Sequence, residues 1–580
     1  MILQSLVSYY EALAARGEIV RPGWEKVKVS YALELDESGQ LLGVLPLKVP
    51  TVDGKKMISR EIILPARVKK TAGVSANFLC ENAAYLLGIG DPVKPERVLD
   101  CFKAAKQLHQ TLLSMVDAPC ANAVCAFFEQ WDTAAAREHP ILLPYIEEFE
   151  SGANLVFFVG DIYPQEHPEI MQSWQAHYDS EEEGTKMTCL VTGKKVVPAA
   201  IHPPIKGVSG AQSSGAALVS FNASADCSFD RQQNYNAPIG KYAAFAYTTA
   251  LNYLIADKKH SKHIGDATVV YWAEDAEPGY RDAFSCYLDS DGDTVTNVDL
   301  DDLMKTIAQG GTVNWNGIPL KPENRFYVLA LAPNAARLSV RFFLRDSFGR
   351  MVENLQAHYN RLQIVGDGRS KFQNIPLWAL LRETINEKSK EKSASPQMAG
   401  DTLRAILTGG SYPATLYQQT QLRIRAEKSI TRGRAAILKA YLIKNTDNES
   451  YKEALTVELN EKTTYQPYVL GRLFAVLEEI QNRASGVTTI KDKYFSSACA
   501  TPAVVFPLIM NLSDKHLRKL ENGPKINYAK QIQALTGAIT HSYPVHHTLY
   551  EQGIFQLGYY HQTQKRYQKK DSVATTEEER

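Results

Sequence analysis

The residues best suited to chemistry lie in a basic segment, Leu422 to Lys444, which reads LRIRAEKSITRGRAAILKAYLIK. Its only acid is Glu427, and its cations are Arg423, Arg425, Lys428, Arg432, Arg434, Lys439 and Lys444. Such a segment can bind the phosphates of a polyanion, and it can equally be the solvated face of a helix. The chain as a whole has 64 basic and 64 acidic residues, so the excess of positive charge is confined to this segment and is not a property of the whole chain.

The spacing in this segment predicts an amphipathic helix over Ile424 to Lys444, although Gly433 weakens that prediction. In such a helix Arg423, Arg434 and Lys444 lie off the apolar face. The residues that would face a core are Ile430, Ala435, Leu438 and Leu442.

A second group of candidate DNA-binding residues lies in segments dense in small polar, aromatic and basic residues: Lys69, Lys70, Ser75, Asn77, Asn222 and Asn236. Amide side chains can read the edges of bases, and lysines can hold phosphates. The simpler interpretation is an amide-rich loop that satisfies only its own backbone.

A third candidate is the glycine-rich loop that contains Gly207, Gly210 and Gly215. Its last two glycines have the spacing of a phosphate-binding P-loop, but Ala216 and Ala217 stand where that loop needs Lys and then Ser or Thr. The loop is therefore predicted either to approach DNA through its backbone or to be a plain turn.

Catalytic and metal-binding patterns are weak throughout the sequence. Asp289, Asp291 and Asp293 resemble the start of a calcium loop, but glycine falls at position four and Leu300 replaces the bidentate glutamate. No HExxH array or GxSxG elbow is present. We expect no catalytic residue, metal or cofactor; the alternative is a metal-dependent nuclease that uses these three aspartates as ligands.

The elements that must position these residues indicate an α+β protein, mixed in its N-terminal body and helical at its C-terminal end. We expect a hairpin from 27–35 and 41–49, and strands at 267–272, 326–331 and 338–344. We expect helices at 78–87 and 99–116. The predicted domains are a mixed body at 1–386, a linker and basic segment at 387–451, a helical bundle at 452–568 and a disordered tail at 569–580.

The general composition predicts a soluble protein of the reducing cytoplasm. Its eight cysteines contain no CxxC pair, and its first twenty residues lack the basic start and apolar run of a signal peptide. No segment has the roughly 18 uncharged apolar residues needed to span a bilayer.

Eight collinear segments resemble the large-subunit family of the type I-C CRISPR surveillance complex, Cascade. They cover nearly the whole chain: GVSANFLCENAAYLLG, LVSFNASADCSF with NYNAPIGKYAAFAYTTALNYLI, VVYWAEDAE, FYVLALAPNAARLSVRFF, AILTGGSYPATL, ITRGRAAILKAYL, YVLGRLFAVLEEIQ and GIFQLGYYHQTQKR. The resemblance implies a non-catalytic subunit that recognises the protospacer-adjacent motif (PAM) in double-stranded DNA, helps to form the R-loop and supports antiviral defence.

The resemblance also implies partners: a guide RNA, backbone and RNA-end-binding Cascade subunits, a small subunit and a recruited helicase-nuclease, but no membrane. In this interpretation Lys69, Lys70, Ser75 and Asn77 approach the motif, and the Gly207–Gly215 loop with Asn222 or Asn236 supports or wedges the duplex. Arg423, Arg425, Arg432 and Arg434 hold a strand's phosphates.

The C-terminal bundle resembles the small-subunit fold, which this family can also produce by internal translation. The neighbouring methionines, Met398 and Met510, do not fit the predicted bundle. A separate bundle would need an alternative start codon, for instance at Leu455 or Val457.

Overall fold

The computed structural model describes residues 1–51, 56–67, 73–91, 93–180, 184–258, 261–288, 305–307, 309, 311–315, 318–366, 374–390, 392–487 and 489–567. The chain divides into two compact units. The N-terminal unit contains Tyr10–His202 and Phe221–Tyr247, and the C-terminal unit contains Met1–Tyr9, Pro203–Ser220 and Thr248–Arg580. These boundaries do not coincide with the predicted limits at 386/387 and 451/452.

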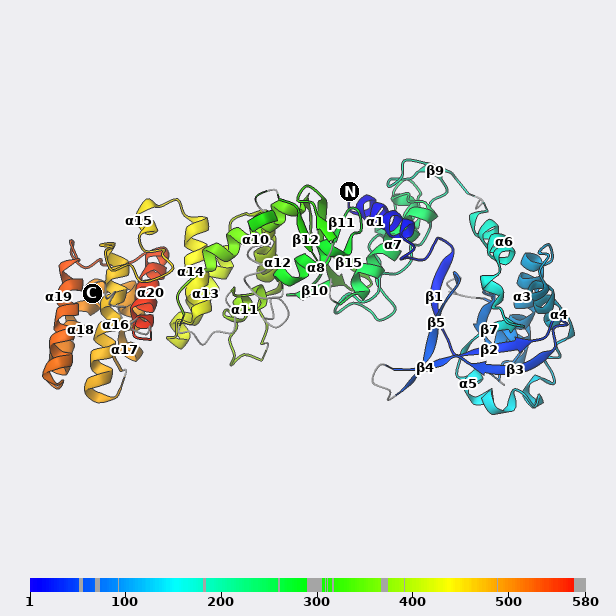
Figure 1. Cartoon of the computed structure of the whole chain (residues 1–580), viewed down its shortest axis with the longest axis horizontal. Coiled ribbons are helices and arrows are strands. Elements are labelled where there is room, and N and C mark those ends of the chain that lie inside the picture. The colour runs from blue at the N-terminus through cyan, green and yellow to red at the C-terminus, as the bar shows by residue number, and fades with distance from the viewer. Residues whose placement is uncertain are drawn as a thin grey trace, which may run out of the picture. The chain divides into compact units, whose positions relative to one another are not determined.

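The N-terminal unit is built on a four-stranded sheet of order β3-β2-β7-β6 (Figure 1). β2 (Tyr31–Leu35) and β3 (Leu41–Pro46) form the predicted antiparallel hairpin. The strands predicted at 27–35 and 41–49 are too long, because Trp24–Val29 (β1) and Lys48–Pro50 (β4) belong to a second sheet. In the hairpin turn, the Asp36 carboxylate accepts hydrogen bonds from the Ser38 hydroxyl and the Gln40 amide, both at 2.8 Å. β7 (Asn154–Val159) runs parallel to β2, and β6 (Cys80–Asn82) runs antiparallel to β7.

Two helices, α3 (Pro95–Leu113) and α4 (Pro119–Gln130), pack with this sheet. Their apolar residues form an aromatic core with the strands, because Phe128 lies 5.8 Å from Phe157 and 4.8 Å from His109 between ring centroids. Other elements of this unit are α5 (Ile146–Glu150), α6 (Pro168–Asp179), β8 (Met187–Thr188) and β9 (Lys195–Val196). Helices α1 (Ile2–Ala15) and α7 (Lys241–Ala256) each contain a boundary between the two units.

A second sheet in the same unit has the order β1-β5-β4. Its strands are β1 (Trp24–Val29), β5 (Met57–Pro65) and β4 (Lys48–Pro50). The helix predicted at 78–87 is wrong in its first half, because Cys80–Asn82 pairs with β7 as a strand and only α2 (Ala83–Leu86) is helical. Leu79, at φ +60°, lies outside the right-handed helical region.

The C-terminal unit begins with an antiparallel sheet of order β10-β11-β14-β15. Its strands are β10 (Ser261–Ile264), β11 (Ala267–Ala273), β14 (Arg325–Asn334) and β15 (Arg337–Ser347), which confirms the three strands predicted here. Every residue of β11 is buried. Trp272 of β11 packs against Tyr9 of α1, with ring centroids 6.1 Å apart. α8 (Pro278–Leu288), β12 (Val313–Trp315), β13 (Ile318–Leu320) and α10 (Phe348–Leu362) complete this part.

The rest of the C-terminal unit after α10 is mainly helical, which confirms the predicted helical C-terminal end. Helices also occupy most of 387–451, which we predicted as a linker and basic segment. The helices after α10 are α11 (Leu377–Arg382), α12 (Pro396–Thr408), α13 (Ala414–Glu427), α14 (Arg432–Asn445), α15 (Glu449–Lys452), α16 (Gln466–Ser485), α17 (Thr489–Ala500), α18 (Pro502–Leu517), α19 (Asn522–Gly537) and α20 (Leu549–Gln564). In the part of the chain that the structure describes, no helix combines the length and apolar character needed to cross a bilayer.

Helices α16 and α20 form the closest pair in this helical region. Each has a glycine at the contact: a Cβ on Gly471 would lie 1.9 Å from the Phe555 carbonyl oxygen, and one on Gly558 would lie 2.2 Å from the Tyr468 carbonyl oxygen. The two backbones can approach this closely only because neither residue has a side chain.

Candidate nucleic-acid interface

Asn77 is buried, with 7% of its surface exposed, and its side chain binds a neighbouring carboxylate. The Asn77 Nδ2 donates to Glu81 Oε1 at 2.7 Å, and the Asn77 backbone N–H donates to the same oxygen at 3.2 Å. Ser75 is half-exposed. Asn77 therefore stabilises the conformation of the segment before β6. Ser75 is more accessible to solvent than Asn77. Lys69 and Lys70 lie outside the described residues.

The segment before β6 is also held by a hydrogen bond to His109 of α3. The Leu79 N–H donates to His109 Nε2 at 2.9 Å, and His109 Nδ1 lies 2.7 Å from the Ala105 carbonyl oxygen. His109 is fully buried, and desolvation lowers its pKa to about 4. We infer that the ring is neutral, with the proton on Nδ1, because Nε2 must accept.

Asn222 and Asn236 lie in one loop of the N-terminal unit but differ in role. Asn222 is exposed, whereas Asn236 organises the loop with its side-chain amide. Asn236 Oδ1 accepts from the Ser228 N–H at 3.0 Å, and Nδ2 donates to the carbonyl oxygens of Arg231 and Gln233 at 2.9 and 3.0 Å. Asn236 therefore braces residues 228–233 by bonds to their backbone.

The braced loop presents Phe229, whose surface is 92% exposed. Phe229, Asp230 and Gln233 all have left-handed backbones, at φ +51°, +57° and +48°. Non-glycine residues adopt this region rarely and at a cost, so three within five residues indicate a specifically built loop. The sequence patterns above do not identify Phe229; its only signal is an aromatic residue within the polar run Ser228 to Gln233.

The glycine-rich loop is a closed turn of the C-terminal unit. Ile205 and Ala216 exchange backbone hydrogen bonds at 2.9 and 2.8 Å, which ties its two ends together. Gly207, Gly210 and Gly215 all have positive φ, and the residues at its tip, 212–214, are exposed. Ala216 continues into extended backbone and not into a helix, which agrees with the rejection of a P-loop.

The basic segment does not form the single helix predicted over Ile424 to Lys444. Helix α13 ends at Glu427 and α14 begins at Arg432, because Lys428 adopts a left-handed C-cap at φ +52° and the Thr431 hydroxyl accepts from the Arg434 N–H as an N-cap. Of the four predicted core residues, Ala435, Leu438 and Leu442 are fully buried. The fourth, Ile430, lies in the turn between the two helices and is only partly buried.

Arg434 is buried, with 5% of its surface exposed, so its predicted place off the apolar face is wrong. Its guanidinium lies 2.6 Å from Glu427 Oε2 and 3.5 Å from Glu383 Oε2, and it donates to the Ser429 carbonyl oxygen at 3.0 Å. These contacts tie the turn between α13 and α14 together. Arg434 therefore has a structural role within this chain.

The other three arginines are more accessible. Arg423 lies 3.7 Å from Glu427, and its side chain is 12% exposed. Arg425 is exposed and hydrogen-bonds the side chain of Gln552 in α20. Arg432 is half-exposed, and its Nε lies 3.4 Å from the Ile364 carbonyl oxygen.

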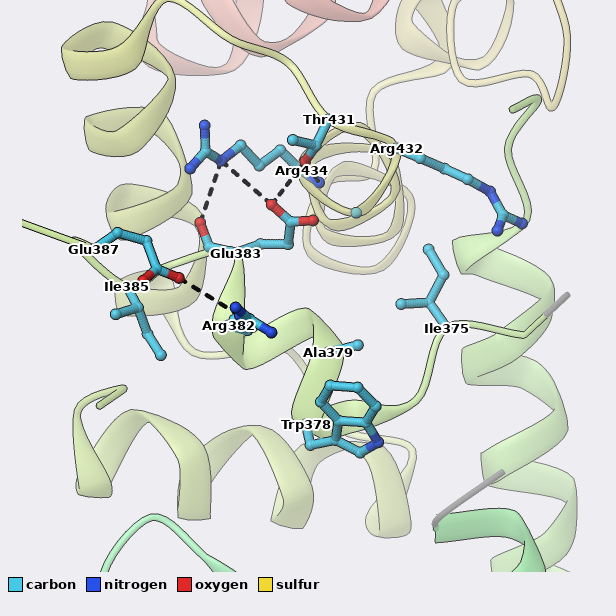
Figure 2. A pocket seen from close by; sticks show the side chains of 11 residues that line it. Ile375, Trp378, Ala379, Arg382, Glu383, Ile385, Glu387, Thr431, Arg432 and Arg434 are labelled. Atoms are coloured by element: carbon cyan, nitrogen blue, oxygen red, sulfur yellow. Dashed lines mark hydrogen bonds and ion pairs between the residues drawn. The ribbon is translucent and has the colours of Figure 1, made fainter. Parts of the chain in front are cut away.

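Arg432 and Arg434 also line a pocket of about 460 Å³ between α11 and the start of α14. Figure 2 shows its side chains, with Trp378 and Arg382 contributed by α11 and Arg432 by α14. In this pocket the Thr431 hydroxyl donates to Glu383 Oε2 at 2.7 Å. Burial raises the pKa of Glu383, and the Thr431 hydroxyl and Arg434 oppose this rise.

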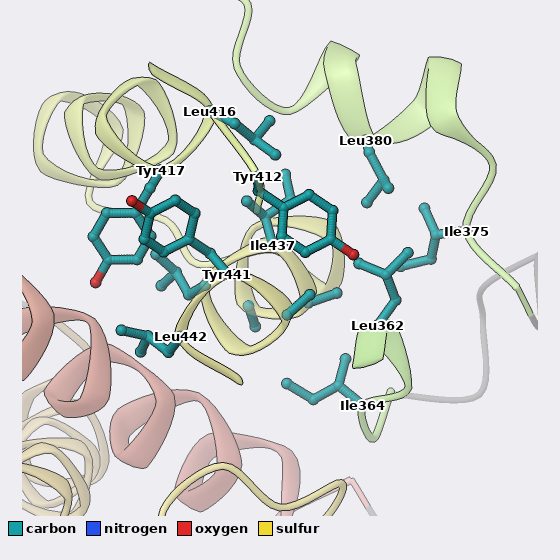
Figure 3. Close-up of a cluster of buried hydrophobic side chains, with 14 of the residues drawn as sticks. Leu362, Ile364, Ile375, Leu380, Tyr412, Leu416, Tyr417, Ile437, Tyr441 and Leu442 are labelled. Carbon is teal, nitrogen blue, oxygen red and sulfur yellow. The ribbon is translucent and has the colours of Figure 1, made fainter. Parts of the chain in front are cut away.

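Most of α14 is core and not surface. Figure 3 shows Ile437, Tyr441 and Leu442 among buried side chains of neighbouring helices. Lys439 is only 3% exposed, and its Nζ donates to the carbonyl oxygens of Arg361 and Gln363 at 3.1 and 2.7 Å. Desolvation lowers the pKa of Lys439 to about 8. The buried part of the basic segment therefore stabilises the fold.

The candidate residues divide between the two units. Ser75, Asn77, Asn222 and Asn236 belong to the N-terminal unit, whereas the glycine-rich loop and the arginines belong to the C-terminal unit. Asp289, Asp291 and Asp293 lie outside the described residues. Among the residues with described positions, no group of three or more His, Cys, Asp or Glu is arranged to hold a metal ion.

The model of the family described as CRISPR-associated protein (Cas_Csd1) matches residues 6–567 of this chain. No curated protein matches it.

Proposed function

Because the chain belongs to the Cas_Csd1 family of CRISPR-associated proteins, we propose that it is the non-catalytic large subunit of a type I-C surveillance complex. In this complex a guide RNA reads the target by base pairing, and this subunit recognises the adjacent motif in the duplex and helps to open it. A similar division between protein and guide is known in another RNA-guided system. A recruited helicase-nuclease would cut the DNA.

The observation that carries this proposal is the braced loop with its exposed Phe229. Proteins that kink or open DNA often insert an apolar side chain between base pairs, which costs a few kcal/mol of stacking energy. An inserted side chain must be held rigidly, and the hydrogen bonds of Asn236 to this loop supply that rigidity. Arg231, exposed two residues later, is assigned to the DNA backbone.

Recognition of the adjacent motif is assigned to the segment around Ser75, which Asn77 and His109 support. The glycine-rich loop, with its exposed tip, is assigned a backbone contact to DNA. Arg423, Arg425 and Arg432 are assigned to the phosphates of one strand, because each has a side chain at least partly accessible. Arg434 supports these residues by holding the turn between their helices.

The test uses the assembled complex with its guide RNA and compares Phe229→Ala with Phe229→Tyr. We expect the alanine variant to open a matched duplex more slowly, measured as permanganate reactivity of thymines in the displaced strand, and the tyrosine variant to behave like the wild type. A duplex already unpaired beside the motif should restore opening in Phe229→Ala, because no insertion is then needed.

Two outcomes would contradict the proposal. One is an alanine variant that opens closed duplexes at the wild-type rate. The other is cleavage of labelled DNA by the purified chain with magnesium or manganese, lost in Asp291→Ala, which would favour the metal-dependent nuclease.

A further inference from the structure

Gln165 has a buried side-chain amide that makes no hydrogen bond within the chain. It lies in a short 3-10 helix of the N-terminal unit, Pro164–Glu166, and only 2% of its surface is exposed. Among the described residues it is the one amide side chain in which Oε1 and Nε2 are both buried and both without a partner. Buried polar groups are nearly always paired in native proteins, so this amide is a candidate for pairing with a ligand.

Gln165 lines a pocket of about 600 Å³ that lies within the same unit. The walls of this pocket come from the segment that leads into β1, from β5 and from the start of α6. They are mainly apolar, and their apolar residues are Ile19, Val20, Trp24, Ile62, Ile63 and Met171. The volume is within the range of small-ligand sites, which usually combine apolar walls with a few polar groups.

The charged residues that line this pocket balance one another. Its two cations are Arg21 and Arg60, its two anions are Glu61 and Glu166, and all four residues are exposed. The guanidinium of Arg21 lies 4.8 Å from the centroid of the Trp24 ring. A phosphate would meet both signs of charge here, so the pocket does not favour a nucleotide or a nucleic-acid strand. The balance favours a neutral ligand.

The amide of Gln165 defines the polar group that such a ligand must carry. A carboxamide donates through Nε2 and accepts through Oε1, and these two atoms lie side by side. Their complement is an acceptor next to a donor on one edge of the ligand, as in the C=O and N–H of a lactam ring. An open-chain trans amide directs these two groups to opposite sides and pairs with only one of the Gln165 atoms.

We propose that this pocket binds a small neutral molecule with an apolar ring system and a lactam edge. Gln165 Nε2 donates to the lactam carbonyl, Oε1 accepts from the lactam N–H, and the rings pack against the apolar walls. Both amide atoms are covered in the structure, so the Gln165 side chain rotates toward the pocket when the ligand enters. This rotation breaks no hydrogen bond, and the two new bonds are therefore a net gain. The inference goes beyond the proposed function, since it involves neither DNA nor RNA.

The test titrates the full-length chain with 2-quinolinone, a bicyclic lactam, and with 1-methyl-2-quinolinone, in which a methyl group replaces the N–H hydrogen. Saturation-transfer NMR measures both affinities. We expect the wild type to bind 2-quinolinone about five- to tenfold more tightly, the factor for one hydrogen bond, and added salt to leave this affinity unchanged. Gln165→Met keeps the length of the side chain without its amide, so it should bind both probes equally. Its melting temperature should be no lower than that of the wild type, because an unpaired buried amide is removed.

Several results would overturn this proposal. The wild type could bind neither probe or both equally, or Gln165→Met could keep the preference for 2-quinolinone, which would place the binding elsewhere. Loss of 2-quinolinone binding once the chain is in the assembled complex would also overturn it, because another subunit would then cover the pocket. These results are distinct from failure of the proposed function, which would appear only in the capture and opening of a matched duplex.

Discussion

At the scale of single residues, the candidate contacts with DNA separate into accessible residues and residues that support them. Asn77 shows the difference, because its amide binds Glu81 inside the protein and only Ser75 is partly open to solvent. The sequence predicted that the Asn77 side-chain amide lies in a segment that contacts DNA. It could not show that the amide points into the protein. Hydrogen-bond partners depend on the tertiary fold, which here brings Glu81 back to Asn77 through the left-handed turn at Leu79.

We expect Asn77→Ala to lower the free energy of unfolding by about 1–3 kcal/mol, because it removes a hydrogen bond from the buried Glu81 carboxylate. Urea denaturation measures this change. Ser75→Ala is the matched variant: it should leave stability nearly unchanged and alter the preference among adjacent motifs in duplex binding by the complex. A Ser75→Ala complex with unaltered motif preference would contradict this assignment.

His109 predicts a specific dependence of stability on pH. Its pKa is about 4 in the folded protein and about 6.5 in the unfolded chain, so the unfolded state binds more protons between these values. Its contribution to stability is therefore present above pH 6.5 and is lost as the pH falls toward 4. Protonation of Nε2 would also remove the acceptor of the Leu79 N–H.

His109→Gln tests this, because glutamine can accept the same hydrogen bond without titrating. We expect the melting temperature of the variant to fall less between pH 6.5 and 4.5 than that of the wild type. Other buried histidines, such as His202 and His358, keep their own contribution in both proteins. Equal slopes in the two proteins would show that His109 does not control this range.

At the scale of elements, the break between α13 and α14 determines which arginines of the basic segment are buried and which are accessible. Helical periodicity correctly identified Ala435, Leu438 and Leu442 as core residues. It could not identify the break, because the left-handed cap lies at Lys428, where glycine would have been the usual signal. The break turns Arg434 inward to Glu383 and Glu427 and leaves Arg423, Arg425 and Arg432 more accessible.

We expect Arg434→Met to lower the free energy of unfolding by about 3 kcal/mol, since it leaves Glu383 without its cation in a partly buried site. Arg425→Gln is the matched surface change and should leave the melting temperature nearly unaltered. It should instead reduce the salt slope of DNA binding by about 0.7–0.9. A stable Arg434→Met protein with a reduced salt slope would assign Arg434 to the DNA.

At the scale of the whole molecule, the sequence indicated the α+β body, the hairpin, the main strands and the helical C-terminal end. It did not indicate that the N-terminal unit is formed from two stretches of chain separated by Pro203–Ser220. Such an arrangement depends on contacts between distant residues, which leave no periodic pattern. The exposed Phe229 was missed for a similar reason, because its presentation depends on Asn236.

The C-terminal helices contain an aromatic cluster, since Phe474, Phe495, Phe555 and Tyr559 pack around one another. They are also joined to α13 by hydrogen bonds such as Gln556 Nε2 to Gln421 Oε1 at 2.8 Å. A separately made bundle that lacks α13 would expose α20 at this contact.

Because the aromatic cluster lies within this bundle, we expect the shorter product to remain folded. A C-terminally tagged gene should yield it as a second product that begins near Leu455 or Val457. Mass spectrometry of the purified products locates its first residue. Synonymous codons that cannot start translation, placed at both positions, should remove the shorter product and leave the full-length chain. Detection of full-length protein alone would contradict internal initiation.

The contact between Tyr9 and Trp272 has a consequence for synthesis on the ribosome. Trp272 is added about 260 residues after Tyr9, which takes on the order of tens of seconds at ordinary elongation rates. During that interval the apolar face of the first helix has no Trp272 to cover it. We expect a chaperone that binds nascent chains to cover this face during the interval.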